Sequence, residues 1–313
     1  MAKVQFVDRE TGALRDELVF GERELRFLYE NGLGRGLTDH VFSAGPFNHL
    51  YGLWQRSRLS RRAIPAFVRR LGIDPVEAAQ PLEAYRSLDD FFTRHLRPGA
   101  RPIDPDPDHL LAPADGRTLV LPRVTLADEL AIKGSRVRLA ELLADPELAA
   151  RYDGGAVVVV RLAPADYHRF HFPADGVAGP ARRVGRRLHS VHPIALDAGA
   201  PSFVNKRVVT TLETERFGRV ALIEVGAMVV GTIVQTYRPG SVARGEEKGT
   251  FRFGGSTVVM LIEPDQVTLD EDLVARSAEG MEVFLKVGTR VARRAGAPES
   301  GAAGGEAPAG DAS

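Results

Sequence analysis

The sequence predicts an α+β protein, with a mainly antiparallel β core, an N-terminal helical extension and a disordered C-terminal tail. Three observations lead to this prediction. Apolar residues follow a helical spacing in parts of the first hundred residues, a proline-rich link comes next, and short β-branched runs separated by glycine or proline fill most of the remainder. We therefore expect a helical region over residues 1–100, a β-rich domain over residues 101–292 and a tail over residues 293–313.

Helical spacing is clearest in two segments near the N-terminus, residues 22–29 (ERELRFLY) and 47–54 (FNHLYGLW). Residues 75–92 predict one or two further short helices, with Ser87 as the N-cap before LDDFF. The link at 97–107 (RPGARPIDPDP) carries enough proline to block both helix and sheet, so it marks the boundary of the extension.

Strand signals dominate the next part of the chain, where β-branched residues gather in short runs bounded by turn residues. The runs are 156–162 (AVVVVRL), 207–211 (RVVTT), 220–225 (VALIEV), 228–236 (MVVGTIVQT) and 254–262 (GGSTVVMLI). The last residues, from 296 onward, are mainly alanine, glycine, proline and serine, which cannot bury a core and are predicted to be disordered.

Composition excludes several classes of function. Lys plus Arg and Asp plus Glu both number 41, so no overall charge attracts nucleic acid, and we expect no such partner. The chain has no cysteine, which excludes disulfides, thiolate zinc sites and a cysteine nucleophile. No secretory h-region and no run of 18 apolar residues is present, so we expect neither a signal peptide nor a membrane span.

Two histidines lie three residues apart in the segment 164–176 (PADYHRFHFPADG). Without cysteine or a nearby carboxylate pattern, His168 and His171 make a poor metal motif, and we expect no bound metal. Their aromatic surroundings would keep an imidazole neutral and able to accept a proton. The alternative is that both are ordinary histidines in a turn.

A carboxylate and a serine complete a possible nucleophile relay. The tetrapeptide PADG occurs twice, so Asp115 and Asp175 are rival carboxylates, and each Asp-Gly pair also suits a simple turn. Ser256 follows two glycines and precedes a hydrophobic run, which fits either a turn entering a strand or a nucleophile activated by histidine.

The serine lacks the G-x-S-x-G elbow of α/β-hydrolases, which argues against a conventional esterase. Its hydroxyl could instead attack the unshielded carbonyl carbon of Gly255. Two alternatives remain open: a soluble Asp-His-Ser hydrolase without self-cleavage, and a non-catalytic β-domain that binds lipid. Both would leave the chain intact.

At these residues the sequence resembles the phosphatidylserine decarboxylase family over roughly residues 85–290. Residues 1–70, with NGLGRG and YGLW, also resemble the N-terminal extension of a bacterial subgroup. The motifs occur in the family's order: residues 113–116 (PADG), 167–171 (YHRFH), 203–207 (FVNKR), 244–249 (RGEEKG) and 255–257 (GST).

The resemblance implies that Asp115, His171 and Ser256 perform a self-cleavage between Gly255 and Ser256, and it favours Asp115 over Asp175. It implies that Ser256 then becomes an N-terminal pyruvoyl group, the covalent cofactor. The products would be a heterodimer of a large chain, residues 1–255, and a small chain, residues 256–313.

The implied reaction is the decarboxylation of phosphatidylserine in a bilayer to phosphatidylethanolamine through a Schiff base on the pyruvoyl group, with His168 as the candidate for returning a proton to Cα. A homodimer of the cleaved unit is also implied, and a soluble amino-acid decarboxylase is the alternative within pyruvoyl enzymes. The sequence departs from the common family pattern at Gly254, where leucine is frequent, and at Lys206, where glutamate is.

A lipid substrate requires access to a membrane. Residues 56–70 (RSRLSRRAIPAFVRR) hold six arginines and no acid, beside Trp54, Ile64 and Phe67, which suits an interfacial helix on anionic lipid. The alternative is a solvated face whose charges meet acids elsewhere. We therefore expect the 1–100 region to associate with the membrane, with the protein bound peripherally on its cytoplasmic face.

Overall fold

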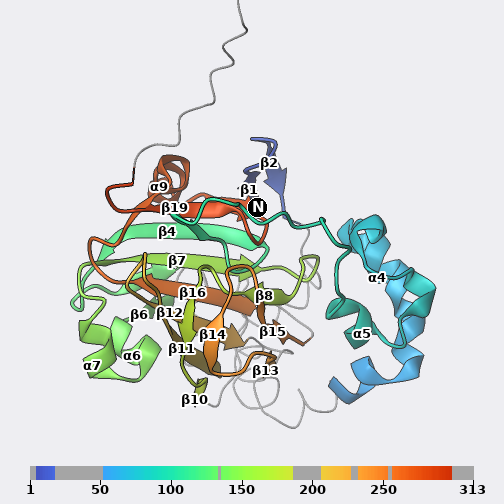
Figure 1. Ribbon diagram of the computed structural model, residues 1–313. Helices are drawn as coiled ribbons and strands as arrows, with labels where there is room; N and C mark the ends of the chain where they lie inside the picture. The colour runs from blue at the N-terminus through green and yellow to red at the C-terminus, as the bar shows by residue number, and fades with distance from the viewer. Residues whose placement is uncertain are drawn as a thin grey trace, which may run out of the picture.

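A computed structural model of the chain describes residues 5–17, 52–132, 135–185, 206–226, 232–252 and 256–297. They form a β-rich body with a helical unit at one side (Figure 1). The fold class expected from the sequence, α+β with a mainly antiparallel β core, is confirmed.

The strands are β1 (Gln5–Asp8), β2 (Leu14–Asp16), β3 (His109–Leu111), β4 (Gly116–Val124), β5 (Leu130–Ile132), β6 (Ser135–Val137), β7 (Gly155–Leu162), β8 (Arg169–His171), β9 (Gly176–Ala178), β10 (Arg182–Val184), β11 (Arg207–Glu213), β12 (Arg219–Gly226), β13 (Ile233–Gln235), β14 (Gly240–Val242), β15 (Glu247–Phe251), β16 (Ser256–Ile262), β17 (Val267–Leu269), β18 (Glu282–Leu285) and β19 (Arg290–Arg294). The α-helices are α4 (Ile64–Leu71), α5 (Leu88–Phe92), α6 (Leu139–Leu143), α7 (Pro146–Ala150) and α9 (Glu271–Ala278). Short 3-10 helices are η2 (Arg58–Ala63), η3 (Pro75–Glu77) and η4 (Leu82–Ala84).

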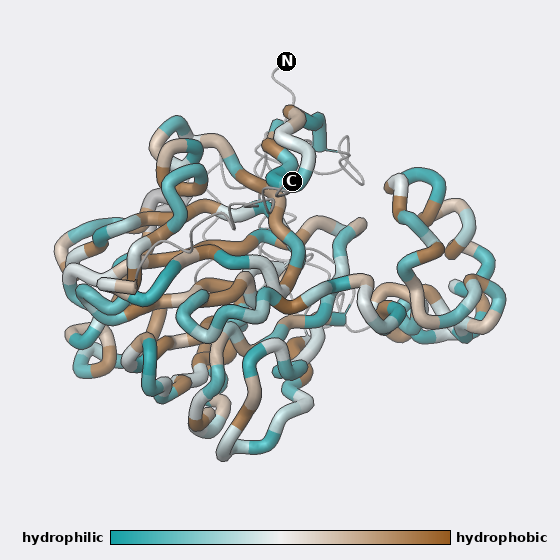
Figure 2. The backbone as a smooth tube through the Cα atoms, turned by 45° about the horizontal axis from the view of Figure 1, so that its top comes forward, coloured by the Kyte–Doolittle hydropathy of each residue, from teal (hydrophilic) through white to brown (hydrophobic). Residues whose placement is uncertain are grey.

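The largest sheet of the described residues is 11-stranded and runs β14-β9-β11-β12-β16-β7-β4-β18-β1-β2, with β10 also paired to β11. Its inner strands are antiparallel neighbours, whereas β1 pairs with β18 in parallel. Smaller sheets have the orders β13-β15-β8, β17-β19-β3 and β5-β6. Figure 2 shows hydrophobic stretches along the strands of the body and more polar loops around them.

Side chains on the inner strands alternate between two cores, as the period of two in a strand requires. Even-numbered positions such as Val258 and Met260 face a core that also contains Phe170 and Phe251 from the β13-β15-β8 sheet. Odd-numbered positions, such as Val259, face a second core shared with helices α6 and α7. The large sheet is therefore covered on both faces.

The helical unit has a small core of its own, made by η2, α4 and α5 with the segments between them. The expected N-cap is confirmed at Ser87, whose hydroxyl accepts a hydrogen bond of 3.2 Å from the backbone N–H of Asp90 at the start of α5. None of the helices in the described ranges combines the length and the hydropathy that crossing a bilayer requires.

The helical expectation for residues 1–100 fails at its beginning, because β1 and β2 are strands. Phe6 of β1 is buried, and the strand pairs with β18 from the far end of the chain, a contact that local periodicity cannot reveal. The predicted helix at 22–29 and most of that at 47–54 lie outside the described residues, as does the tail from 298 onward. Strand β19 ends at Arg294, so order extends just past the expected start of the tail at 293.

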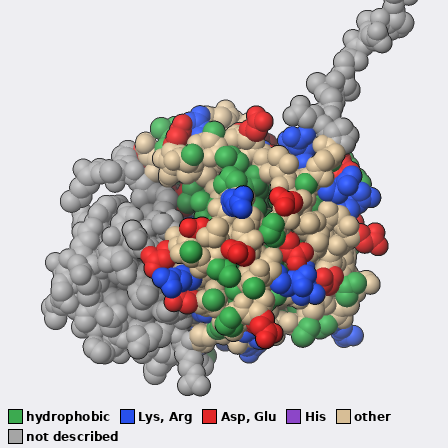
Figure 3. Space-filling view, turned by 90° about the vertical axis from the view of Figure 1, so that its left-hand side faces the viewer, with side chains coloured by type: hydrophobic (Ala, Val, Ile, Leu, Met, Phe, Trp, Pro, Cys, Tyr) green, Lys and Arg blue, Asp and Glu red, His purple; other side chains and the backbone are tan. Residues whose placement is uncertain are grey.

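The predicted strands at 156–162, 207–211, 220–225 and 254–262 correspond to β7, β11, β12 and β16. Of the run 228–236, the structure describes only β13 as a strand. Figure 3 views the left-hand side of Figure 1 and shows acidic and basic side chains interspersed with hydrophobic ones on that face, in keeping with the formal net charge of zero.

Candidate active site

Ser256 is the first residue of β16, an inner strand of the large sheet. It lies opposite Gly226 of β12 on one side and Leu162 of β7 on the other, and it is completely buried. Its hydroxyl oxygen has no hydrogen-bond partner in the described part of the chain. A buried hydroxyl without a partner is costly, which makes this serine a candidate for chemistry rather than for packing. Gly254 and Gly255 lie outside the described residues.

Asp115 immediately precedes β4, at the same end of the sheet as Ser256. Strand β7 lies between β4 and β16 in the sheet. Leu162 of β7 therefore lies between the start of β4, which follows Asp115, and Ser256 of β16. The glycine of this PADG motif is required by close packing, because a Cβ on Gly116 would come within 2.7 Å of the Arg161 carbonyl oxygen. The motif is therefore more than a surface turn.

The Asp115 carboxylate is buried, and both of its oxygens accept hydrogen bonds. It accepts hydrogen bonds from Arg101 Nη2 at 2.6 Å and Nε at 2.9 Å, and from the Val287 backbone N–H at 2.9 Å. The same guanidinium binds Glu77 of the helical unit, with Nη2 at 2.9 Å from Oε2. Burial would lower the pKa of Arg101, but its two carboxylate partners outweigh burial and raise it. Arg101 therefore carries a permanent charge that links the helical unit to Asp115.

His171, in β8, lies beside the Asp115 loop through its backbone. Its N–H donates to the Pro113 carbonyl oxygen at 2.7 Å, while its Nδ1 lies 2.9 Å from the Gly245 carbonyl oxygen. Because a carbonyl can only accept, Nδ1 carries the proton and Nε2 keeps its lone pair. That Nε2 is buried without a hydrogen-bond partner among the described residues.

The electrostatic environment keeps the His171 imidazole neutral. Burial lowers its pKa below the ordinary histidine value, outweighing the raising effects of the Gly245 carbonyl, Glu247 and Asp115. The hydrogen bond that orients the ring comes from Gly245, in the RGEEKG motif, and not from the Asp115 carboxylate. Among the described residues Asp115 makes no hydrogen bond to the His171 ring, and its negative charge raises the pKa of that ring.

His168 is the residue immediately before β8, and it is completely buried. Its ring centroid is 3.8 Å from that of Phe92 in α5, and its Nδ1 lies 2.9 Å from the Asp166 carbonyl oxygen. The Asp166 carboxylate in turn binds Arg117 and accepts a 2.6 Å hydrogen bond from the Ala163 N–H. Asp166 was missed by sequence reasoning, although it lies within the histidine motif.

The rival carboxylate, Asp175, lies in a different environment. It is exposed, and its Oδ1 accepts a hydrogen bond of 2.9 Å from the Arg244 backbone N–H. The structure therefore groups the segments that carry Asp115, His168, His171 and Ser256, and it leaves the Asp175 carboxylate at the surface although Ala174 of the same motif is buried. The tetrapeptide alone did not distinguish the two copies, and only the family resemblance favoured Asp115.

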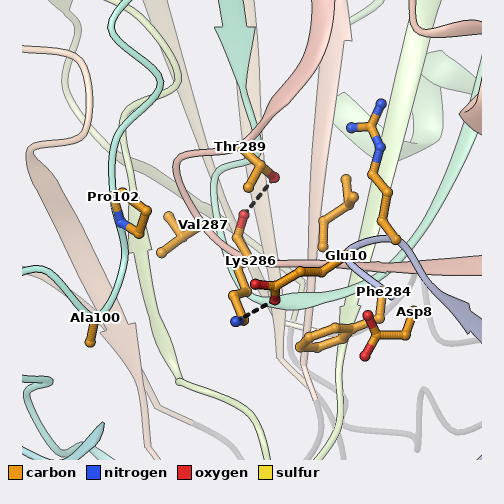
Figure 4. A pocket seen from close by; sticks show the side chains of 10 residues that line it. Asp8, Glu10, Ala100, Pro102, Phe284, Lys286, Val287 and Thr289 are labelled. Carbon is orange, nitrogen blue, oxygen red and sulfur yellow. Dashed lines mark hydrogen bonds and ion pairs between the residues drawn. The ribbon is translucent and has the colours of Figure 1, made fainter. Parts of the chain in front are cut away.

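A cavity of about 410 Å³ lies next to the Asp115 loop (Figure 4). Val287, whose N–H binds Asp115, forms part of its wall, together with Pro102 and Phe284. The Lys286 ammonium binds Glu10 at 2.6 Å at its edge. Its lining includes none of the four predicted site residues, so the buried serine and histidines are not reached through this cavity as it stands.

Comparison with known proteins places the segments that carry these residues within a known family. The model of the phosphatidylserine decarboxylase family matches residues 88–293, a span that contains all the predicted site residues. The chain belongs to the phosphatidylserine decarboxylase family. The family and the relatives' name, proenzyme, imply maturation of the pyruvoyl type.

Relatives named phosphatidylserine decarboxylase proenzyme support this membership of the decarboxylase family over nearly the whole chain. The protein of Chlamydia muridarum is 43% identical over 291 residues, covering 92% of this chain and 97% of the relative. That of Chlamydia pneumoniae is 43% identical over 295 residues, covering 94% and 98%. That of Chlamydia felis is 42% identical over 298 residues, covering 95% and 100%.

Proposed function

We propose that this chain is a proenzyme that cleaves itself between Gly255 and Ser256 and then decarboxylates phosphatidylserine to phosphatidylethanolamine. The observation that carries the proposal is the buried, unpartnered hydroxyl of Ser256 at the start of an inner strand. A second buried group without a partner, Nε2 of the neutral His171, supports it. The relatives' printed name, proenzyme, agrees with a chain made in inactive form.

Self-cleavage requires a base for the serine hydroxyl. His171 Nε2 accepts the Ser256 proton, and the oxygen attacks the Gly255 carbonyl carbon. The peptide C–N bond breaks, the proton passes to the released amine of residue 256, and an ester now joins the two residues. His171 is neutral again at this point, ready for a second proton.

The ester then eliminates. Loss of the Cα proton of residue 256 expels the carboxylate of Gly255, which becomes the C-terminus of the large chain. The dehydroalanine left behind tautomerises to an imine, takes up water and releases ammonia, leaving a ketone. The steps consume one water molecule and need no oxidant or reductant.

Asp115 is a positioning residue in this scheme. As His171 takes up a proton, the ring becomes positively charged inside the protein, where an unpaired charge is costly. The negative charge of Asp115 and the Gly245 carbonyl dipole both favour the charged ring. Arg101 fixes Asp115 where it can act.

The residues fit a pyruvoyl group at position 256, because the serine that would form it is buried and its hydroxyl is free of competing hydrogen bonds among the described residues. When formed, such a group binds the substrate amine and accepts the electrons released as CO₂ leaves. We assign His168 to return a proton to the substrate Cα. The contact of its Nδ1 with the Asp166 carbonyl leaves Nε2 as the atom that exchanges the proton.

We also propose that the protein binds the cytoplasmic face of a membrane peripherally through the η2 end of the helical unit. Leu53, Trp54 and Leu59 are exposed there among exposed arginines. Sequence reasoning named Ile64 and Phe67 as lipid-facing, but both are buried in the core of the helical unit. Apolar groups with arginines around them suit the interface of an anionic bilayer.

Intact-mass measurement of the purified protein tests the central claim. The wild-type chain of 34.0 kDa should give pieces of 255 and 58 residues, roughly 28 and 6 kDa in proportion to length, with a blocked N-terminus on the smaller one. Ser256→Ala should remain a single chain without decarboxylase activity. The matched control, Ser241→Ala at an exposed serine of β14, should cleave normally. An active protein that is one unbroken chain would contradict the proposal.

A further inference from the structure

Three side chains form a closed polar cluster inside the main core. Lys248 Nζ lies 2.9 Å from Glu224 Oε1 and donates to Gln235 Oε1 at 2.7 Å. Gln235 Nε2 completes the ring by donating to Glu224 Oε2 at 2.8 Å. Lys248 is 1% exposed and Glu224 is completely buried. A buried ion pair adds little to stability over a well-packed apolar pair, so its presence calls for another explanation.

The cluster shares a sheet face with Ser256. Glu224 and Gly226 point to the same side of β12, and Gly226 is the residue directly opposite Ser256. Residues diagonal to one another across antiparallel strands have Cα atoms roughly 7–8 Å apart. The Lys248 ammonium contacts Glu224 on this face. It therefore lies about a side-chain length from residue 256.

A β-bulge directs Lys248 into the core. The register of β15 against β8 shifts between Glu247, opposite His171, and Gly249, opposite Phe170, so Lys248 is the extra residue. Its Nζ lies 5.5 Å from the ring centroid of Phe170 and 5.1 Å from that of Tyr237. The bulge thus places an amine among aromatic rings on the sheet face that also carries Ser256.

An amine at this place could react with position 256 once that position carries a ketone. A neutral lysine amine in an apolar pocket is a nucleophile that condenses with carbonyl groups. Burial lowers the pKa of Lys248, and contact with Glu224 opposes that effect. Tyr237 is the other ionisable group against Nζ in the described part of the chain, and burial raises its pKa, so the phenol stays neutral. Burial raises the pKa of Glu224, and its contact with Lys248 opposes that effect, so each partner favours the charged form of the other.

We propose that Lys248 is a latent covalent-modification site and that Glu224, with Gln235, keeps it from reacting with the ketone formed at position 256. The inference rests on the proposed function, because it requires that ketone. The prevented step is a condensation: the amine nitrogen bonds to the ketone carbon, the carbonyl oxygen leaves as water, and a C=N bond joins residue 248 of the large chain to residue 256 of the small one. No oxidant or reductant takes part.

Glu224→Gln tests the proposal, since it keeps the size and hydrogen bonding of the side chain but removes its charge. The purified, cleaved variant is treated with borohydride without substrate and measured by denaturing mass spectrometry. We expect a species in which the two chains are joined, lighter than their sum by one water and then heavier by two hydrogens after reduction. Because losing a charged partner can shift a buried lysine pKa by several units, decarboxylase activity should fall by at least about tenfold.

Two matched variants separate this mechanism from simple structural damage. Glu224→Gln combined with Lys248→Met should show no joined species and should regain activity, whereas Glu224→Gln combined with Ser256→Ala, which lacks the ketone, should show none and remain uncleaved. Recovery of activity alone would also follow from removing an unpaired buried charge. The joined mass is the readout that a structural role does not produce.

A second test uses the wild-type protein and therefore does not require the variant to fold. Its joined species should be absent near neutral pH and increase as pH rises and Lys248 deprotonates. Cleaved protein that forms no joined species, either in a folded Glu224→Gln variant or in the wild type at any alkaline pH, would overturn the inference. A wild-type chain that stays whole at 34.0 kDa would instead count against the proposed function itself.

Discussion

At the scale of single residues, the site depends on which nitrogen of His171 holds the proton. The Gly245 carbonyl fixes Nδ1 as the protonated atom, which leaves Nε2 as the base without any help from a carboxylate hydrogen bond. Gly245 itself adopts a φ of 75°, a conformation that favours glycine. A single backbone carbonyl, presented by a glycine turn, thus sets the tautomer of the proposed base.

The pH dependence of self-cleavage should report the state of His171. Burial lowers its pKa, so the ring is neutral at pH 7 and becomes protonated only in more acidic solution. Precursor made by cell-free synthesis and shifted to a series of pH values should cleave at a constant rate around neutrality. Below the lowered pKa the rate should fall about tenfold per pH unit. A midpoint above the ordinary histidine value would contradict a neutral, buried base.

The Arg101–Asp115 pair should be coupled in stability. Arg101→Met leaves a buried carboxylate without its cation and should lower the free energy of unfolding by about 3 kcal/mol. Adding Asp115→Asn should restore much of that loss, because it removes the unpaired charge. Urea unfolding in a Ser256→Ala background keeps the chain in one piece for the measurement. Additive losses in the double variant would show that the two side chains do not depend on each other.

At the scale of elements, the helical unit connects the exposed apolar and basic surface to the histidine segment. Phe92 of α5 stacks on His168, and Arg169 donates to the Thr93 carbonyl oxygen at 2.8 Å. Arg94 donates to the Ala165 carbonyl oxygen at 3.1 Å. The helical unit, whose η2 end is proposed to touch lipid, is therefore in direct contact with the histidine segment through α5 and the two residues after it.

Removing charge from η2 should weaken membrane binding. Arg58→Gln with Arg62→Gln removes two exposed charges worth about 1 kcal/mol each near an anionic surface, so binding should drop roughly 30-fold. Flotation with phosphatidylserine-containing liposomes measures the effect. Arg123→Gln with Arg138→Gln changes the net charge equally at exposed sites of the β body and should float like the wild type. Equal flotation of both variants would remove η2 from the interface.

What the sequence could predict depended on whether the information was local. Strands β7, β12 and β16 were predictable because β-branched runs between glycines have a local pattern. Strand β1 was not predictable, because it is stabilised by pairing with β18, which lies far away in the chain. The direction of Ile64 and Phe67 was also unpredictable, because helical spacing reveals an apolar face without saying what covers it.

The candidate site likewise contains residues that the sequence could predict and residues that it could not. Its chemical residues lie in short motifs, so Asp115, His171 and Ser256 could be named from sequence. The hydrogen-bond partners of these residues could not be named from sequence. Arg101, the partner of Asp115, lies in a proline-rich link with no motif of its own. Gly245, the partner of His171, lies 74 positions away from it in the chain. Long-range hydrogen bonds leave no spacing pattern for sequence reasoning to use.

At the scale of the whole molecule, the proposed break falls at the start of β16, an inner strand of the largest sheet. Strand β16 pairs along its full length with β12 and β7, and all three are interior strands. Strand β18 likewise lies between β1 and β4. The proposed small chain therefore has extensive backbone pairing with the proposed large chain on both sides of two of its strands.

The two chains should remain together after cleavage without any covalent link. Native size-exclusion chromatography should elute them as one species, while denaturing conditions should release the small chain. A pair of such units, the expected homodimer, would elute at twice the cleaved unit's mass. Separation of the small chain in native buffer would contradict the observed strand pairing.

The position of β18 between a parallel and an antiparallel neighbour also bears on how such a molecule can be made. A polypeptide beginning at residue 256, synthesised on its own, would expose both edges of β16 and β18 to any other chain with free backbone groups. Making both parts as one continuous polypeptide allows each strand to find its neighbours before the backbone is severed. The proposed scission would thus be a finishing step, made after the strands have assembled.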